Sequence, residues 1–311
     1  MPYIIRALFG SALLLAVITG CTTTQYAKML IEQNTTSGKV KESIVGSSEQ
    51  LIKSNRISAA RLLTMPDGVK IDVWIYKHKP ADSSKSRGTV LILHDIGNSK
   101  ADYRILAKKL AGKGFDVVLP DLRAHGRSTG KYTTFGAKEK YDQKYVIDEL
   151  YREKLISRPL YVFGFDLGGA TAIQYAAIDP RVNGVIAVAP NRDIFSFCRR
   201  FLPIISEAEA TKVIAKAGKI AKFDPSEASA LKAAAKLKCP LILIHGQLDM
   251  TVALSDSKTL YEAAAGPKEL NVLPMANHTT IMFMREGDIV KGIERLAAGS
   301  VGLKKTDKTN P

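Results

Sequence analysis

The sequence predicts an α/β fold in which helices cover both faces of a mostly parallel, twisted sheet. Short continuous apolar runs alternate with longer stretches of helical periodicity, which is typical of repeated strand–helix units. The apolar runs are not interrupted by polar residues, as expected for parallel strands that are buried on both faces. A chain of 311 residues is long enough for one large domain of this class with additional segments.

The individual elements follow from these runs. An opening hairpin is predicted from strands 60–64 and 69–76, because the turn residues Pro66-Asp67-Gly68 separate them. The other predicted strands span residues 89–93, 115–119, 160–163, 185–188, 241–244 and 270–273. The predicted helices span residues 102–111, 138–154, 169–177, 256–265 and 281–297.

Residues 191–238 break this rhythm. The segment is helix-rich, with polar and alanine-rich stretches, and it is inserted between two predicted strands. An insertion at this point would lie over the carboxyl ends of the strands, where open α/β sheets bind ligands. We therefore expect a small helical cap.

The first twenty residues have the features of a signal peptide. Arg6 supplies a positive charge, and residues 7–18 form an apolar stretch that is too short to span a membrane. Ile18-Thr19-Gly20-Cys21 resembles a bacterial lipobox. The resemblance implies cleavage before Cys21, lipidation of that cysteine and anchoring in the cell envelope, at the outer membrane or the outer face of the inner membrane. A plain secretory signal and an uncleaved anchor are the alternatives.

Composition sets the remaining boundaries. Residues 21–57 are rich in Ser, Thr, Lys and Gln and are predicted to form a tether, with the folded domain at 58–300. Residues 301–311 are predicted to form a polar tail. Once Cys21 carries lipid, Cys198 and Cys239 remain, and we expect two thiols rather than a disulfide framework.

The charge favours some partners over others. The whole chain carries +15, and without Arg6 it has 45 − 1 = 44 bases against 30 acids, or +14. This charge favours anionic lipid headgroups or acidic envelope polymers. A nucleic-acid partner is not predicted, because no basic motif is interleaved with aromatic residues. Neither a metal nor an organic cofactor is predicted, because the sequence has no clustered metal-ligand spacing and no phosphate-binding glycine loop.

Three segments carry the predicted chemistry. Asp166 lies in Gly164-Phe165-Asp166-Leu167-Gly168-Gly169, between a predicted strand and a helix, which is the context of a nucleophile elbow. Asp249 and His278 each follow a later strand. Nucleophile, acid and histidine therefore come in the chain order of α/β-hydrolases, and the predicted catalytic set is Asp166, Asp249 and His278.

Two further motifs strengthen this resemblance. The segment 93–99, Leu-His-Asp-Ile-Gly-Asn-Ser, resembles the oxyanion loop of the α/β-hydrolase superfamily. The segment 121–130, Asp-Leu-Arg-Ala-His-Gly-Arg-Ser-Thr-Gly, resembles a motif of its serine-aminopeptidase-like and monoacylglycerol-lipase-like branch. The resemblance spans about residues 60–297 and implies an α/β-hydrolase fold, with an oxyanion hole formed by the backbone N–H groups of Ile96 and Leu167.

The sequence departs from the family pattern at several positions. Asp166 replaces the usual serine, and Asp95 replaces a customary glycine. Haloalkane dehalogenases, which use an aspartate nucleophile, usually carry tryptophan where this chain has Leu167. Epoxide hydrolases usually carry an H-G-x-P loop and cap tyrosines, whereas residues 94–97 are His-Asp-Ile-Gly and residues 191–238 contain no Tyr. Neither substrate class is therefore predicted.

Three hypotheses follow. In the first, Asp166 attacks an electrophilic carbon of a small organic substrate, and His278 then activates water to hydrolyse the resulting ester. In the second, the chain is a catalytically impaired pseudo-hydrolase that serves as a binding protein in the cell envelope. In the third, another hydroxyl restores a serine-type activity, although no other serine occupies an elbow. Structural roles in loops and turns are expected for His94, Asp121, Arg123, His125 and His245.

Overall fold

The computed structural model describes residues 22–32, 45–78 and 85–301. The signal peptide, Cys21 and the predicted tail from residue 302 lie outside the described residues. The strands are β1 (Ala59–Thr64), β2 (Lys70–Tyr76), β3 (Thr89–Leu93), β4 (Asp116–Pro120), β5 (Leu160–Phe165), β6 (Val182–Val188), β7 (Leu241–Gly246) and β8 (Lys268–Leu273). The helices outside the cap are α2 (Thr23–Ile31), α4 (Ser48–Lys53), η1 (Lys100–Tyr103), α5 (Arg104–Gly112), α6 (Glu139–Arg152), α7 (Leu167–Ala176), α11 (Leu254–Ala263) and α12 (Thr280–Ala297).

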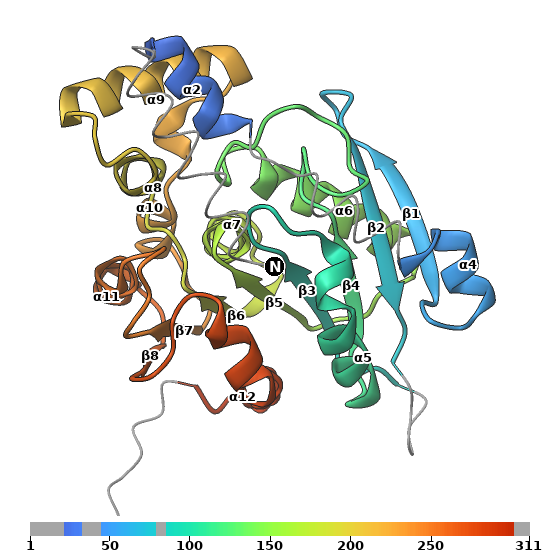
Figure 1. Cartoon of the computed structure of the whole chain (residues 1–311). Coiled ribbons are helices and arrows are strands. Elements are labelled where there is room, and N and C mark those ends of the chain that lie inside the picture. The colour runs from blue at the N-terminus through green and yellow to red at the C-terminus, as the bar shows by residue number, and fades with distance from the viewer. Residues whose placement is uncertain (1–21, 33–44, 79–84, 302–311) are drawn as a thin grey trace, which may run out of the picture.

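The strands form one eight-stranded sheet (Figure 1) in the order β1-β2-β4-β3-β5-β6-β7-β8. β1 pairs antiparallel with β2, and β2 pairs antiparallel with β4. All the other pairings are parallel. The predicted fold class, an opening hairpin followed by a parallel α/β sheet, is confirmed.

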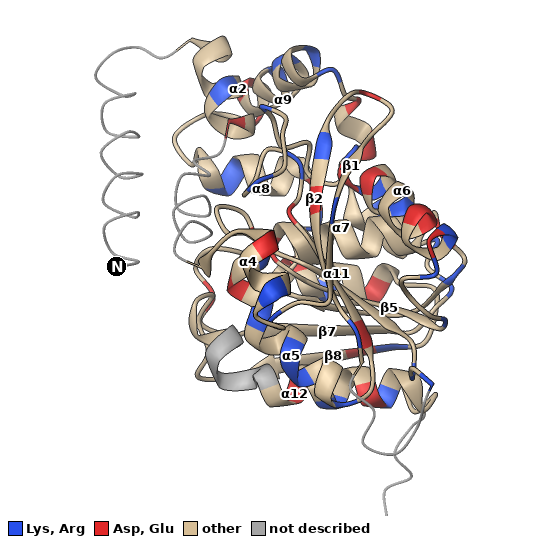
Figure 2. Ribbon diagram, turned by 90° about the vertical axis from the view of Figure 1, so that its right-hand side faces the viewer, with Lys and Arg blue, Asp and Glu red and all other residues tan. Residues whose placement is uncertain are grey.

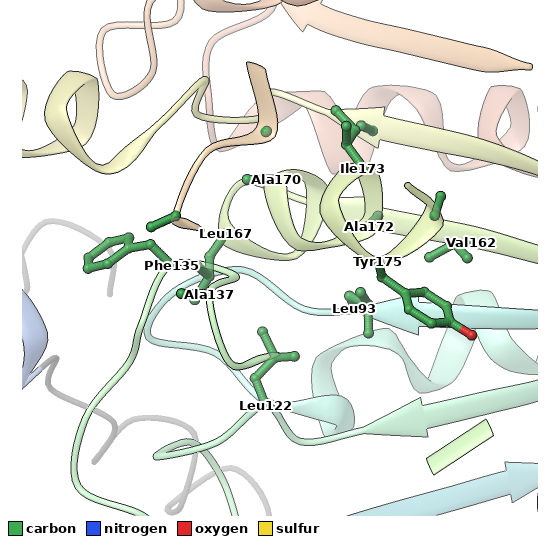
Figure 3. Close-up of a cluster of buried hydrophobic side chains, with 14 of the residues drawn as sticks. Leu93, Leu122, Phe135, Ala137, Val162, Leu167, Ala170, Ala172, Ile173 and Tyr175 are labelled. Atoms are coloured by element: carbon green, nitrogen blue, oxygen red, sulfur yellow. The ribbon is translucent and has the colours of Figure 1, made fainter. Parts of the chain in front are cut away.

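Each face of the sheet has its own hydrophobic core, because successive strand residues point to opposite faces. On β3, Val90 and Ile92 join the core that contains the apolar residues of α5 and α12. Leu91 and Leu93 join the other core, which contains those of α6, α7 and α11. Figure 3 shows part of this second core, with Leu93 of β3 near the α7 side chains. Continuous apolar runs therefore mark strands that are covered on both sides.

A helical segment separates β6 from β7. It comprises α8 (Ile194–Phe201), α9 (Glu207–Ala221), η2 (Pro225–Glu227) and α10 (Ala230–Ala234). The apolar residues of this segment join the core on the α7 face of the sheet. Both Cys198 and Cys239 are free thiols, as expected. This segment is referred to below as the cap.

The interval predicted to be a tether differs from that expectation. Its described residues include two packed helices: α2 contacts α9 of the cap, and α4 contacts β1. Ala27, Leu30 and Ile31 of α2 are fully buried, because their spacing puts them on one face of the helix. Within residues 22–32, 45–78 and 85–301, no helix is both long and apolar enough to cross a membrane.

Candidate active site

Asp166 lies in a sharp turn between β5 and α7. Its backbone has φ of 50° and ψ of −112°, an unusual conformation for a residue with a side chain. The neighbouring glycines make the turn possible, because a Cβ on Gly164 would lie 2.1 Å from the carbonyl oxygen of Gly168. A Cβ on Gly168 would lie 2.1 Å from the carbonyl oxygen of Leu93. The described turn has the geometry expected of a nucleophile elbow.

The carboxylate of Asp166 is buried and has donors on both oxygens. The backbone N–H of Ile96 lies 3.5 Å from Oδ2, and the backbone N–H of Leu167 also donates to the carboxylate. Asn191 donates from Nδ2 to Oδ1 at 2.7 Å. The two donors predicted for an oxyanion hole therefore point at the carboxylate of residue 166 itself.

The structure brings the predicted acid and histidine together. The Nδ1 atom of His278 lies 2.7 Å from Oδ2 of Asp249, whose Oδ1 accepts from the backbone N–H groups of Thr251 and Val252 at 2.8 Å each. The His278 ring also stacks on Phe165, with the ring centroids 4.8 Å apart. Since Phe165 directly precedes Asp166, this stack places the histidine beside the elbow.

The charges of these residues are coupled. Burial raises the pKa of Asp166, and the nearby His278 and the two backbone donors offset this only in part. Burial lowers the pKa of His278, but the hydrogen bond to Asp249 and the charges of Asp166, Asp249 and Asp95 outweigh it, so that the pKa is raised overall. The resting site therefore favours an imidazolium between carboxylates.

Asp95 adds a third carboxylate at this site. It accepts hydrogen bonds from Tyr103 Oη at 2.8 Å and from Asn98 Nδ2 at 2.6 Å. Burial and the charge of Asp166 raise its pKa to about 6, although the hydrogen bond from Tyr103 opposes the shift. The side chain is thus fixed next to the predicted oxyanion hole, where its negative charge would oppose a developing oxyanion.

The other conspicuous polar residues hold loops or turns. His94 accepts from the backbone N–H of Leu122 at Nε2 and therefore donates from Nδ1 to the carbonyl of Asp95. Burial lowers the pKa of His94 to about 3, which keeps it neutral. The ring nitrogens of His245 lie near Ser257 Oγ and the Val252 carbonyl oxygen. Arg123 donates hydrogen bonds to the carboxylates of Asp142 and Asp67. Asp121 accepts from the backbone N–H groups of Lys100 and Arg127. His125 contacts the Arg123 carbonyl through Nδ1.

A polar network that the sequence did not reveal connects Asp166 to the cap. The Oδ1 atom of Asn191 accepts from Arg200 of α8. Arg200 forms an ion pair with Asp256 of α11 at 2.9 Å, and Ser196 donates to the same Asp256 oxygen at 2.6 Å. Sequence reasoning missed Asn191 because an asparagine just after a strand is also an ordinary turn residue.

The space beside the elbow is small. A cavity of about 10 Å³ adjoins the first turn of α7, which is room for about one water molecule. The cavity is lined by Phe135, Leu167, Ala170, Gln174, Asn191, Asp193, Ala228 and Ala230. Among the described side chains, no group of three or more His, Cys, Asp or Glu is arranged to hold a metal ion.

Comparison with known proteins agrees with this geometry. Residues 88–217 match the family model described as alpha/beta hydrolase fold. The chain is 24% identical over 229 residues to the uncharacterized protein YfhR of Escherichia coli K12, covering 73% of this chain and 76% of that one. It is 25% identical over 201 residues to the lysophosphatidylserine lipase ABHD12 of Xenopus tropicalis, and the matched residues cover 60% of this chain and 49% of the lipase. The structure of the esterase Pf2001 of Pyrococcus furiosus superposes with a TM-score of 0.63 at 25% identity, and the match covers 80% of this chain and 95% of the esterase.

The elbow, the acid–histidine pair and the eight-stranded sheet define a protein of α/β-hydrolase type. Together with the match of residues 88–217 to the alpha/beta hydrolase family model and the similarity to an esterase and a lipase, this fold supports a hydrolase.

Proposed function

We propose that the chain is a membrane-anchored hydrolase that forms an ester between Asp166 and a small organic substrate. The main support is the surroundings of the Asp166 carboxylate. One of its oxygens faces the Ile96 N–H, and the carboxylate carries a charge coupled to that of His278. A serine would need a base to attack, whereas a carboxylate is already a nucleophile when it is ionised.

The proposed reaction has two steps. In the first, Oδ1 of Asp166 bonds to an electrophilic carbon, and the leaving group departs with the bonding electron pair. The resulting ester carries no charge, so His278 loses one of the anions that raise its pKa. The imidazolium then releases its proton to solvent, and in the second step the neutral His278 takes a proton from water while the hydroxide adds to the ester carbonyl. The oxyanion on Oδ2 would accept from Ile96 and Leu167. As it collapses, His278 returns its proton to the departing alkoxide, which leaves as an alcohol, and the new carboxylic acid loses its proton to restore the carboxylate.

Membrane anchoring is the second part of the proposal. Its support is the lipobox-like sequence that ends at Cys21, with acyl groups on that cysteine as the anchor. Several acyl chains would hold the protein firmly, because each buried methylene contributes about 0.8 kcal/mol. The partners of the proposed enzyme are thus a small-molecule substrate and a membrane of the cell envelope.

Asp166→Ser tests whether the catalytic scaffold is competent. We expect the parent chain from Thr22 onward to leave p-nitrophenyl acetate intact, since attack by a carboxylate would give a high-energy mixed anhydride. Asp166→Ser should hydrolyse it at least about a hundredfold faster than Asp166→Asn, because Asp249 and His278 would supply general-base catalysis. A parent that alone hydrolyses the ester would contradict our account of Asp166.

His278→Gln tests the covalent step itself. Without the base, an Asp166 ester should accumulate and add the alkyl mass of a reactive probe to the intact protein. Primary alkyl halides and terminal epoxides are suitable probes, and Asp166→Asn combined with His278→Gln is the matched control. No mass change across these probes, with esterase activity present in Asp166→Ser, would refute an aspartate nucleophile of this kind.

A binding function is the second candidate, and two observations favour it. The Oδ1 atom of Asp166 is already engaged by Asn191 at 2.7 Å, and the adjoining cavity holds only about one water. A pseudo-hydrolase would retain the charged cluster as a structural element. If Asp166→Ser is inert on esters and His278→Gln gains no mass, this candidate replaces the hydrolase.

A further inference from the structure

We propose that the α2–α9 surface, formed by residues 22–32 and 207–222, binds the anionic phospholipid headgroups of a membrane, so that the cap faces the bilayer. The proposal deepens the anchoring proposed above and rests on it for the identity of that membrane. It follows from where α2 is fixed, from the charge of α9 and from the groove beside it.

The helix that follows Cys21 is fixed to the cap. In Figure 1, α2 and α9 lie side by side. The end of α2 is also held by the loop between β4 and α6, where the backbone N–H of Thr133 donates to the Ile31 carbonyl at 3.0 Å and Lys131 pairs with Glu32 at 3.1 Å. Thr22 is the N-cap of α2, so an acyl group on Cys21 would begin one residue from a docked helix. Without free chain between them, the lipid would hold the cap against the headgroups.

The exposed side of α9 is basic. Lys212, Lys216 and Lys219 follow i, i+4, i+7 spacing and share one exposed face of the helix. Glu209, in the first turn of α9, acts on Lys212 through its charge. Residues 191–238 contain ten bases and five acids, a difference of +5. Figure 2 shows basic positions in blue on α9 and on α2 at this end of the molecule.

A groove of about 700 Å³ runs along α9 toward the loop that follows it. Its lining includes the apolar residues Ile214 and Phe223 and the basic residues Lys219 and Lys222. Apolar contacts beside positive charges fit an amphiphile whose phosphate pairs with lysine and whose glycerol and first methylenes cover the apolar part. A soluble anion would leave that apolar part without a partner, so the observations favour a phospholipid surface.

Vesicle binding tests the surface without the lipid anchor. The chain from Thr22 onward retains every described element, and it should co-sediment with vesicles of phosphatidylcholine and phosphatidylglycerol but not of phosphatidylcholine alone. High salt should release it, because screening shortens the reach of these charges. The triple variant Lys212→Gln, Lys216→Gln, Lys219→Gln should bind roughly a hundredfold more weakly, since each lysine near an anionic surface contributes about fivefold.

The matched control removes the same charge elsewhere. Lys108→Gln, Lys109→Gln, Lys113→Gln alters exposed lysines on and just after α5, distant from α9 in Figure 1. This variant should bind like the parent. Equal weakening of both triple variants, or no binding of the parent to anionic vesicles, would overturn the proposal. Retention of the parent by soluble polyphosphate without vesicle binding would assign the surface to a polyanion and would overturn it as well.

A separate measurement distinguishes this proposal from the anchor. The intact mass of the full chain, purified from bacterial membranes, reports whether Cys21 carries acyl groups. An unmodified Cys21 refutes the anchor, and the vesicle result still decides the surface. An acylated Cys21 together with failed vesicle binding leaves the anchor in place and refutes the α2–α9 surface.

Discussion

Three carboxylates share the surroundings of one histidine. Asp249 binds the Nδ1 side of His278, while Asp166 and Asp95 act on the same ring through their charges. An acyl-transfer site would stabilise an oxyanion near Ile96, and an ionised Asp95 works against that. A mechanism in which Asp166 loses its charge in the first step reduces the repulsion among these groups. In the proposed mechanism, esterification of Asp166 removes one of these charges before the oxyanion forms near Ile96.

Asp95→Asn tests how much the ionised carboxylate of Asp95 lowers the free energy of unfolding. Burial raises the pKa of Asp95 from 3.8 to about 6, so the stability it contributes is present below about pH 4 and is lost as pH rises through 6. The variant should gain up to about 3 kcal/mol in unfolding free energy near pH 7, with the gain shrinking toward pH 4. Urea unfolding across this pH range measures it. A gain that does not depend on pH would contradict a buried, titrating Asp95.

The elements differ in how far their sequences reveal them. The expected strand ranges lie close to those of β1–β8. The apolar runs are most continuous in the central strands β3, β4, β5 and β7, which are buried along their whole length. The helix α2 was not expected to pack, because only Ala27, Leu30 and Ile31 form its apolar face and their partner α9 is about 180 residues away in the chain. Contacts that depend on distant partners leave little trace in a short polar segment.

Leu30→Ala tests whether α2 belongs to the folded domain. Leu30 is fully buried, so its truncation should cost about 2–5 kcal/mol of local or global stability. Lys28→Ala on the same helix, at an exposed position, should change stability by less than about 0.5 kcal/mol. Hydrogen exchange of α2 and α9 together with thermal unfolding distinguishes the two. If both variants behave alike, α2 is not docked on the cap.

At the scale of the whole molecule, the chain order predicted that Asp166, Asp249 and His278 lie close together, because the parallel sheet brings the carboxyl ends of β5, β7 and β8 to one edge. The contacts of Asn191, Arg200 and the Phe165 ring could not be predicted in the same way. These contacts depend on how the cap packs on the sheet and on the directions of the side chains, and strand order determines neither of these.

Asp256→Asn tests how the cap is held to the body. Asp256 is buried in α11 and joins Arg200 and Ser196 of α8, so its loss leaves Arg200 without this ion pair. Because Arg200 is partly exposed, we expect a cost of about 1–3 kcal/mol rather than that of a fully buried pair. Hydrogen exchange should increase in α8 and α9 and remain unchanged in β3 and β5. Lys144→Gln, which removes an exposed pair with Asp148 on α6, should leave all four elements unchanged. Faster exchange in the sheet and the cap alike would mean that they open as one unit, and the small cavity at Asp166 could then not be enlarged by cap movement alone.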